Sequence, residues 1–320
     1  MPTLSVVIPA TNNPPTLQRA LAAVRASTSP PEELLVIEQP EAAGPAEARN
    51  AGAALARSDV LVFVDADVEV SADALERIRT AFEHDDELAA VFGSYDDDPA
   101  GDGIVSDFRN LLHHHVHQEN AGSASTFWAG LGAIRREAFS RAGGFDAERF
   151  PLPSVEDIEL GLRLVRDGEK VVLDPAIQGK HLKAWTIATM VQTDLWRRGV
   201  PWLQLMLEEG SSSTALNLGW RHRLSAGASV GLVATLGLRK PKLAGTLLVL
   251  AVALDAPFYL LLYRKRGVKL LVAGIPLHVI HRLTSVAAVP LALAEHARAR
   301  TRARNRPPLQ AEPRLPEDPR

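Results

Sequence analysis

Strand and helix patterns alternate through the first 67 residues of the chain. Three short apolar runs, each with the length of a buried strand, occupy residues 4–9, 34–38 and 60–64. Apolar residues at helical spacing lie between them, over residues 16–24 and 46–57. This alternation is typical of a parallel sheet whose crossover helices cover its faces. The sequence therefore predicts an α/β fold, with ligands bound beyond the carboxyl ends of the strands.

Two acids follow the strand pattern at residues 60–64 directly. Successive side chains of an extended chain point to opposite faces, so Asp65 and Asp67 share a face. Two carboxylates on one face suit a hard divalent cation such as Mg2+ or Mn2+, which can in turn hold phosphates. The alternative is a solvated strand end before a helix cap, because Ser71 and Asp73 open a helical pattern just beyond.

Charge divides the chain into two unlike parts. Residues 1–210 contain 18 Lys and Arg against 33 Asp and Glu, whereas residues 211–320 contain 17 against 5. The acidic first part argues against nucleic acid as a partner, and the basic second part is interleaved with apolar runs, which points to a membrane surface. The absence of cysteine excludes disulfides, thiolate catalysis and cysteine-based zinc sites. We expect no signal peptide, because residues 1–10 have a strand pattern without a basic leader.

Apolar runs in the last third predict membrane helices. Residues 217–238 and 243–263 flank a basic turn, and the second run is about 20 residues long, enough to cross a bilayer. We therefore predict a transmembrane hairpin over residues 217–263. Residues 264–297 are predicted to form an amphipathic helix in the interface, because prolines and ionisable residues interrupt the apolar run there. Residues 298–320 are predicted to be a basic, Pro-rich disordered tail.

The distribution of Lys and Arg predicts the orientation of the chain relative to the membrane. With the first domain in the cytoplasm, only the basic turn Arg239, Lys240 and Lys242 would lie outside, and the other Lys and Arg of the C-terminal part would lie inside. We therefore expect the cell (inner) membrane as location, with the first domain on its cytoplasmic face. Residues 185–216, with tryptophans beside arginines, are predicted to be an amphipathic interfacial linker. The alternative is that the apolar runs are core helices of a soluble domain.

Five motifs, in order, resemble the family 2 glycosyltransferases with the GT-A fold. They are Val6-Val7-Ile8-Pro9, Ala48-Arg49-Asn50-Ala51-Gly52, Asp65-Ala66-Asp67, Gly143-Gly144-Phe145-Asp146 and Glu156-Asp157-Ile158-Glu159-Leu160. The resemblance covers residues 4–183 and implies a GT-A domain over residues 1–184, a Rossmann-like, mostly parallel sheet flanked by helices. It further implies transfer of a sugar from a nucleotide-diphosphate sugar, usually a UDP-sugar, with inversion at the anomeric carbon and dependence on Mn2+ or Mg2+.

The resemblance assigns the donor side of the site. Pro9, Ala10 and Asn12 match the first nucleotide-binding loop, and Arg49 matches an arginine that contacts the nucleotide. Glu38 matches the acid that contacts the base or ribose, although the family more often has Asp there, which leaves the base open.

The remaining matches concern the metal and the catalytic base. Asp65 and Asp67 match the pair that holds ribose and metal-diphosphate, and His181 matches a late histidine that completes the metal shell. Asp157 matches the base, with Glu156 beside it as support or acceptor contact. Inversion requires one such base, on the face of the sugar opposite the leaving group. We expect a lipid-linked or membrane glycan acceptor, with its hydroxyl or phosphate as the group that attacks the sugar.

The sequence also allows other interpretations. A non-catalytic nucleotide-sugar or lipid-binding protein could keep the same fold, although the presence of both the acid pair and the base argues against it. A nucleotidyltransferase would need a basic Gly-rich loop after the first strand, and residues 10–14 contain no Lys or Arg. Four histidines within residues 113–117 could suggest a metal site. We favour a helix or loop with solvated or hydrogen-bonded imidazoles beside the acceptor cleft, because adjacent residues converge poorly on one ion.

Overall fold

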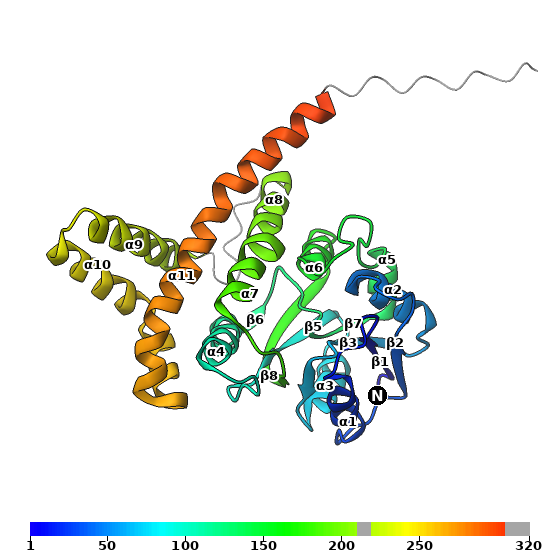
Figure 1. Cartoon of the computed structure of the whole chain (residues 1–320). Coiled ribbons are helices and arrows are strands. Elements are labelled where there is room, and N and C mark those ends of the chain that lie inside the picture. Colours follow the sequence, from blue (N-terminus) through cyan, green and yellow to red (C-terminus); the bar gives the residue numbers. More distant parts are fainter. Residues whose placement is uncertain (210–218, 305–320) are drawn as a thin grey trace, which may run out of the picture.

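The computed structural model describes residues 1–209 and 219–304, and one mixed sheet forms the centre of the first part (Figure 1). The strand order is β2-β1-β3-β7-β5-β8-β4, and β6 pairs with β8 off this path. The strands are β1 Leu4–Pro9, β2 Glu33–Ile37, β3 Val60–Val64, β4 Val68–Val70, β5 Leu88–Tyr95, β6 Gly122–Ser123, β7 Leu131–Arg135 and β8 Lys170–His181.

The first three strands form the expected parallel unit. β1 pairs in parallel with both β2 and β3, with Pro9 opposite Ile37 and Val7 opposite Phe63. Every residue of β3 is buried, as the continuous apolar run predicts. The sheet as a whole is mixed rather than mostly parallel, because β7 lies antiparallel between β3 and β5. Although the helix α4 Ile104–Glu119 lies between β5 and β7 in the chain, β7 is antiparallel to both of its neighbours.

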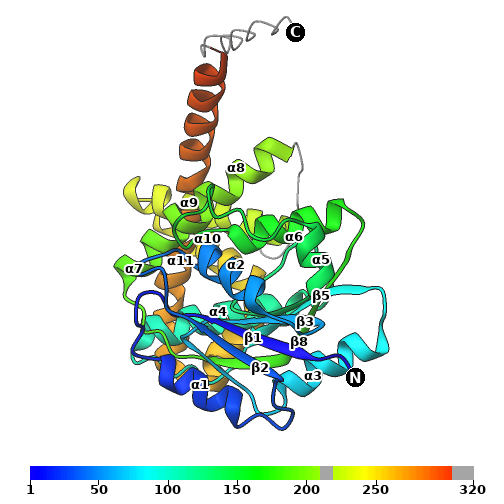
Figure 2. The same ribbon diagram turned by 90° about the vertical axis from the view of Figure 1, so that its right-hand side faces the viewer.

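Helices cover both faces of this sheet (Figures 1 and 2). In these views α1 Leu17–Arg25 and α3 Ala74–His84 lie below the sheet. The helices α2 Pro45–Leu55, α5 Arg136–Arg141 and α6 Glu156–Arg166 lie above it. Both layers pack on one apolar core built from the strand interiors. The carboxyl ends of β1, β2 and β3 are left at one edge, where ligands of such sheets bind.

The remaining helices form a second layer beside the sheet domain. The helix α4 Ile104–Glu119 contains the four histidines. It is followed, after the sheet is complete, by α7 Ile187–Gln192, the π-helix η1 Thr193–Gly199, α8 Val200–Glu209, α9 Trp220–Gly237, α10 Pro241–Leu254 and α11 Ala256–Arg304. A separate apolar cluster joins α4 to α11, with Phe108 and Leu111 against Phe258 and Leu262. The C-terminal helices are thereby attached to the sheet domain.

The predicted transmembrane hairpin needs new bounds. α9 and α10 lie side by side as a helical hairpin (Figure 1), but the run 243–263 is divided, because α10 ends at Leu254 and α11 begins at Ala256. Asp255 lies at this break and pairs with Arg282 at 3.1 Å. At about 1.5 Å per residue, the 14 residues of α10 extend about 21 Å, less than the roughly 30 Å of a bilayer core.

The helix α11 also crosses two predicted boundaries. It continues through Pro276 and Pro290 without ending, and its one non-helical residue is Gly267, with φ +70°. This kink divides α11 into residues 256–266 and 268–304, so the second part begins four residues after the start predicted at residue 264. A disordered tail from residue 298 is wrong as far as Arg304, and the rest of that tail lies outside the described residues, as do residues 210–218 of the predicted linker. Within the described ranges, one helix, Ala256–Thr301, is long and apolar enough to cross a membrane.

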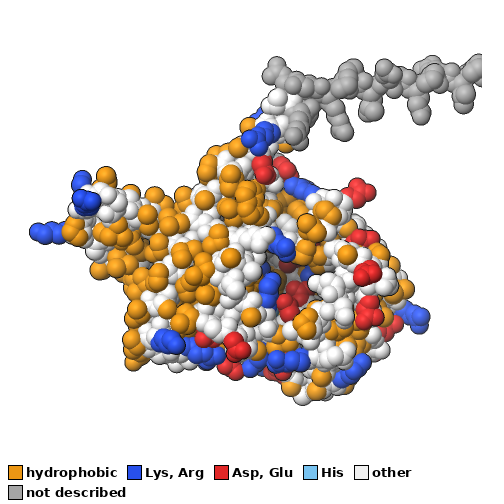
Figure 3. All heavy atoms as spheres, viewed as in Figure 1, with side chains coloured by type: hydrophobic (Ala, Val, Ile, Leu, Met, Phe, Trp, Pro, Cys, Tyr) orange, Lys and Arg blue, Asp and Glu red, His pale blue; other side chains and the backbone are white. Residues whose placement is uncertain are grey.

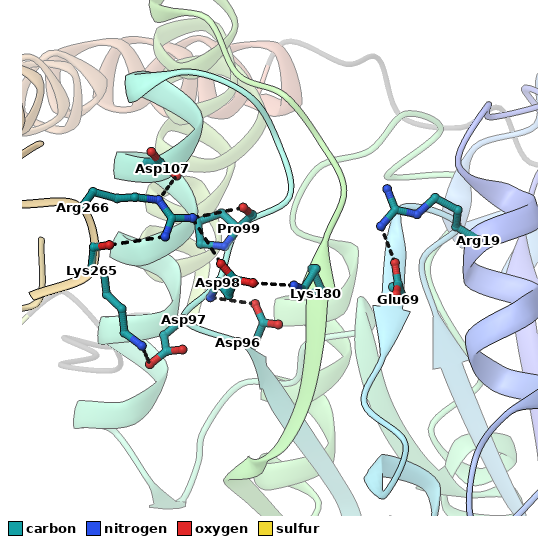
Figure 4. Close-up of polar contacts among 10 residues, drawn as sticks. All are labelled: Arg19, Glu69, Asp96, Asp97, Asp98, Pro99, Asp107, Lys180, Lys265 and Arg266. Atoms are coloured by element: carbon teal, nitrogen blue, oxygen red, sulfur yellow. Dashed lines mark hydrogen bonds and ion pairs between the residues drawn. The ribbon is translucent and has the colours of Figure 1, made fainter.

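Charged side chains connect the start of α11 to the sheet domain (Figure 4). Arg266 donates a hydrogen bond to one carboxylate oxygen of Asp98 at 3.3 Å, and Lys180 of β8 binds the other at 2.7 Å. Lys265 forms an ion pair with the adjacent Asp97. The loop after β5 is thus held from both sides, which links the sheet to the C-terminal helices just before the kink at Gly267.

Candidate active site

Arg49 brings two predicted site acids together. Its side chain is 4% exposed and donates hydrogen bonds to Asp65 at 2.6 Å and to Glu156 at 3.0 Å. Asp65 follows β3, Arg49 comes from α2 and Glu156 begins α6, so three elements meet on one guanidinium. Burial raises the pKa of Asp65, and the charge of Arg49 opposes this effect. Charges this deeply buried are stable only when paired in this way.

Both carboxylate oxygens of Glu156 accept hydrogen bonds from other residues of the protein. One oxygen accepts the hydrogen bond from Arg49, and the other accepts the Ser154 N–H at 2.8 Å. The residue is 4% exposed. Of its two expected roles, this position favours support of the site over contact with an acceptor.

Asp67 and His181 meet through the register of two strands. β4 pairs antiparallel with the end of β8, with Val68 opposite His181, and this brings His181 Nε2 to 3.5 Å from Asp67 Oδ2. On its other side, His181 Nδ1 lies 2.6 Å from Asn110 Oδ1. Tyr95 stacks on the imidazole at a centroid distance of 4.2 Å. Burial raises the pKa of Asp67, but hydrogen bonding and charge from His181 outweigh this, and the pKa is lowered overall.

The side chains of Asp67 and His181 are of the types that bind a divalent cation. Metal-binding histidines characteristically direct their second ring nitrogen to an oxygen acceptor, as His181 does with Asn110. The other ring nitrogen of His181, Nε2, faces the carboxylate of Asp67. Asp65 is close enough for the charge of Asp67 to raise its pKa. Across residues 1–209 and 219–304, no three His, Asp or Glu side chains already converge on a metal position. A cation here would therefore need further oxygen ligands from a diphosphate or water.

Asp157 lies at the start of α6, where its surroundings raise the proton affinity of its carboxylate. One carboxylate oxygen accepts the Ala129 N–H at 3.2 Å, and the other accepts the Ile158 N–H at 2.8 Å. Burial and the neighbouring Glu156 raise the pKa of Asp157 to about 6, against the opposing charge of Arg49. A carboxylate with a pKa in this range is ionised at neutral pH and accepts a proton more readily than an ordinary one.

The predicted nucleotide loop lies at the same edge of the sheet. Pro9 and Ile37 are opposite each other in register, and the Ala10 N–H donates to the Ile37 carbonyl at 2.8 Å. The chain therefore leaves β1 beside the end of β2, where Asn12 and Glu38 are both exposed. No contact among the described residues joins these exposed side chains to Asp65 or Asp157.

A cavity of about 690 Å³ adjoins Asp157. Its walls come from the segment 126–128 and from α4, α6, η1, α8, α9 and α11, so it lies between the sheet domain and the C-terminal helices. Figure 3 shows Asp and Glu side chains in a hollow near the centre of this face, beside Lys or Arg side chains. Asp157 borders the cavity on one side, and mostly apolar helices border it on the other.

The histidine cluster lies on α4, and two of its four imidazoles are hydrogen-bonded to carbonyls of β5. His114 Nδ1 lies 2.8 Å from the Tyr95 carbonyl, and His117 Nδ1 lies 2.9 Å from the Gly93 carbonyl. Burial lowers the pKa of His117 to about 4, which keeps its ring neutral at physiological pH. His113 and His117 line the cavity, so the cluster does border the predicted acceptor side.

Two residues near the site were not found from the sequence. Asn110 orients His181, and Arg198 lines the cavity beside Asp157. Asn110 sits in a helix with no motif around it, and only the packing of α4 against the end of β8 shows its role. Arg198 stood out only as a cation beside tryptophans, a signal that pointed to lipid headgroups rather than to a cavity.

Comparisons with known proteins agree with this geometry. Residues 32–143 match the family model described as glycosyl transferase family 2, a stretch that includes Arg49, Asp65 and Asp67. The structure is similar to that of the mannosyltransferase PcManGT from Pyrobaculum calidifontis in complex with GDP-Man and Mn2+, with 18% sequence identity, a TM-score of 0.55, and coverage of 92% of this chain and 88% of that one.

A further solved structure, GalNAc-T7 with UDP, GalNAc and Mn2+, aligns at 16% identity over 65% of this chain and 48% of that one, with a TM-score of 0.46. No curated protein sequence matches the chain significantly. The fold and the family match together define a glycosyltransferase with a GT-A fold. The match to the glycosyl transferase family 2 model covers residues 32–143, about a third of the chain.

Proposed function

We propose that the protein transfers a sugar from a nucleotide-diphosphate sugar, with inversion, to an acceptor at a membrane surface. The observation that carries this proposal is the position of Asp157, a base with a pKa of about 6 that lines a cavity of about 690 Å³. Its neighbour in the chain, Glu156, forms an ion pair with Arg49. Arg49 also pairs with Asp65, at the edge of the sheet where a nucleotide would bind. Base and donor side are thereby held in one rigid arrangement.

On the donor side, each residue has a distinct proposed task. The loop at Pro9, Ala10 and Asn12, together with Glu38, would bind the nucleoside, and a UDP-sugar is the first donor to test. Arg49 orients Asp65 toward ribose and diphosphate. Asp67, His181 and Asp65 would hold Mn2+ or Mg2+, and a bound divalent cation offsets the negative charge of the leaving diphosphate.

On the acceptor side, Asp157 takes the proton from the attacking hydroxyl. The acceptor oxygen forms its bond to the anomeric carbon while the bond from that carbon to the diphosphate breaks, and the diphosphate leaves with the electron pair. Attack occurs on the face opposite the leaving group, so a single displacement inverts the anomeric configuration. The buried position of Asp157 raises its proton affinity, which favours this transfer.

The C-terminal helices support a membrane-proximal acceptor. Val233, Val249 and Leu250 are exposed apolar side chains of α9 and α10, and basic residues occupy the turn between these helices. Because α10 is short, we propose that this hairpin lies in the lipid interface and that α11 provides the deeper anchor. The sheet domain would then stand on the cytoplasmic face of the cell membrane.

The test is donor turnover by the purified full chain in detergent. Release of UDP or GDP from a panel of donor sugars, with Mn2+ and a membrane lipid extract as acceptor source, should identify the donor. Asp157→Asn should lower the rate by about 10²- to 10⁴-fold while leaving donor binding intact. Asp167→Asn, an exposed acid at the end of the same helix, is the matched control and should keep full activity.

Two outcomes would contradict parts of the proposal. Full turnover by Asp157→Asn would exclude this residue as the base, and an unchanged Mn2+ requirement in Asp67→Ala would exclude Asp67 as a ligand. Donor binding without turnover, under all acceptor conditions, would instead identify a non-catalytic nucleotide-sugar or lipid-binding protein.

A further inference from the structure

His113 differs from the other histidines of the cluster on α4. His114 and His117 each place Nδ1 within hydrogen-bond distance of a carbonyl of β5. His115 packs on Phe258 of α11, with ring centroids 5.4 Å apart. His113 lines the cavity instead, and its Nδ1 is buried without a hydrogen-bond partner among the described residues. Buried polar atoms are normally hydrogen-bonded, so this imidazole is a candidate for contact with a ligand.

The chemical state of His113 narrows the kind of ligand group that it can bind. Burial lowers the pKa of His113 well below its usual value, so the ring is neutral at physiological pH. A neutral imidazole has one donor and one acceptor nitrogen, and a hydrogen bond at one nitrogen normally fixes which of them carries the proton. No such bond holds Nδ1 of His113 within the described residues. The ring can therefore donate or accept, which suits a hydroxyl group better than an anion.

A short segment beside His113 connects the donor side to the proposed base. The Asp65 N–H donates to the Gly130 carbonyl at 3.0 Å, and the Ala129 N–H donates to Asp157 at 3.2 Å. Trp128 belongs to the same segment and lines the cavity, and its indole lies against Gly130, where an added Cβ would come within 2.5 Å of the ring. In a displacement with inversion, the sugar lies between the leaving diphosphate and the base. This segment would therefore flank the sugar.

Contacts between aromatic rings place His113 and Trp128 close to the proposed metal ligand His181. The ring of Tyr95 stacks on His181 at a centroid distance of 4.2 Å. The same ring lies 4.4 Å from His113 and 4.8 Å from Trp128, and the rings of His113 and Trp128 are 4.9 Å apart. In a nucleotide-diphosphate sugar, the sugar is bonded directly to the diphosphate, so its ring would lie next to the side chains that hold that group. Tyr95 alone separates His181 from both cavity rings, which matches this distance.

We propose that His113 and Trp128 bind the ring of the transferred sugar, with Trp128 against its C–H groups and a nitrogen of His113 hydrogen-bonded to one of its hydroxyls. This inference rests on the proposed function, because it takes the donor to be a nucleotide sugar. Apolar walls with a few placed polar groups are typical of small-molecule sites. A site built to hydrogen-bond a hydroxyl discriminates strongly against an analogue that lacks it. His113 is therefore a residue that determines which sugar is accepted.

Binding can be tested without any acceptor. UDP-glucose, UDP-N-acetylglucosamine and GDP-mannose are titrated calorimetrically into the purified full chain with Mn2+, and UDP and GDP are titrated as ligands that lack the sugar. His113→Phe keeps an aromatic ring and removes both nitrogens. It should weaken binding of the nucleotide sugar by about 5- to 100-fold, because a buried hydroxyl loses its partner. The affinity for the nucleoside diphosphate should stay within about twofold.

Two further variants and a set of analogues separate recognition from packing. His115→Phe makes the same change two residues along α4, where the side chain packs on α11, and should leave both affinities unchanged. His113→Gln keeps a donor and an acceptor and should recover most of the affinity that His113→Phe loses. Among analogues of the donor that each lack one sugar hydroxyl, the native chain should bind one much more weakly than the parent. His113→Phe should bind that analogue and the parent equally.

Several results would overturn the inference. These are an unchanged nucleotide-sugar affinity in His113→Phe, native discrimination among the deoxy analogues in that variant, and equal losses for nucleotide sugar and nucleoside diphosphate. The last result would mean that His113 acts on His181 through Tyr95. Native donor binding with a raised acceptor KM would place His113 at the acceptor instead. Donor binding without turnover would contradict the proposed transfer alone, because these titrations need no acceptor, whereas a native chain that binds no nucleotide sugar would contradict both.

Discussion

Arg49 is the residue on which the geometry of the donor side depends. It is almost completely buried and holds Asp65 and Glu156 from two different elements of the fold. Because Glu156 precedes Asp157 in the same helical turn, the position of Asp157, the proposed base, is coupled to that of Asp65. One guanidinium therefore couples the two halves of the site.

Arg49→Met should destabilise the protein strongly. Removal of one partner from a buried ion pair leaves carboxylates without compensation, which costs about 3 to 5 kcal/mol of the free energy of unfolding. Denaturant unfolding in detergent measures the loss. Arg57→Met, at an exposed position just after α2, should change stability by about 0.5 kcal/mol or less. Equal stability of the two variants would show that Arg49 is dispensable for folding.

The raised pKa of Asp157 predicts a specific pH profile. Only the ionised carboxylate accepts a proton, so kcat/KM should be constant above about pH 6 and fall tenfold per pH unit below it. A series of nucleotide-release assays from pH 4.5 to 8 measures the profile. An ordinary aspartate would place the break near pH 4. A break at that lower value would mean that burial does not control this group.

At the scale of elements, close packing of α6 on the segment 126–129 sets the position of Asp157, the proposed base. Gly161, one turn after Asp157, lies so near this segment that an added Cβ would come within 2.2 Å of the Phe127 nitrogen. The same segment donates the Ala129 N–H to Asp157. The glycine therefore permits the approach on which the hydrogen bond depends.

Gly161→Ala should separate α6 from this segment. The expected cost is about 1 to 3 kcal/mol of stability, since backbone atoms cannot move aside as a flexible side chain does, together with a fall in kcat from the displaced base. Gly245→Ala is the matched control, because nothing lies within 4 Å of its added Cβ inside α10, and stability there should rise slightly. Unfolding curves and turnover of both variants test this. Native turnover in Gly161→Ala would contradict the packing argument.

The whole molecule combines an acidic sheet domain with a basic and apolar helical layer. Figure 3 shows hydrophobic side chains over the α9 and α10 region, with Lys or Arg at its tip. The cavity lies between the two layers, so the proposed acceptor in the lipid interface would have a short path to Asp157. The proposed membrane location would therefore bring the acceptor to the cavity, a consequence that the charge distribution alone does not indicate.

Membrane binding should depend on the surface of α10 and not on exposed apolar residues in general. Val249 and Leu152 are both 68% exposed, the first on α10 and the second in the sheet domain. Val249→Glu should weaken binding of the full chain to anionic lipid vesicles by about tenfold or more, because an apolar contact is replaced by a repelled charge. Leu152→Glu should leave binding unchanged. Vesicle flotation measures both, and equal flotation would place the membrane contact elsewhere.

Local patterns in the sequence were sufficient for much of the sheet domain. The run at residues 60–64 became the fully buried β3, and the acids after it lie at the ligand-binding edge, because the strand period and strand polarity are local properties. The mixed order of the sheet was not predicted, since the pairing of β7 depends on contacts between distant segments. The helix break at Asp255 was missed for a similar reason, because its partner Arg282 is 27 residues away.

The sequence by itself determined the alternation of strands and helices, the acids at strand ends, the family resemblance and the basic, apolar C-terminal third. These features follow from residue type and spacing along a few turns of chain. Only the tertiary structure decided that Arg49 joins Asp65 to Glu156, that Asn110 orients His181, and that Arg198 lines the same cavity as Asp157. Those contacts depend on strand register and on helices packed across long separations, which no local pattern encodes.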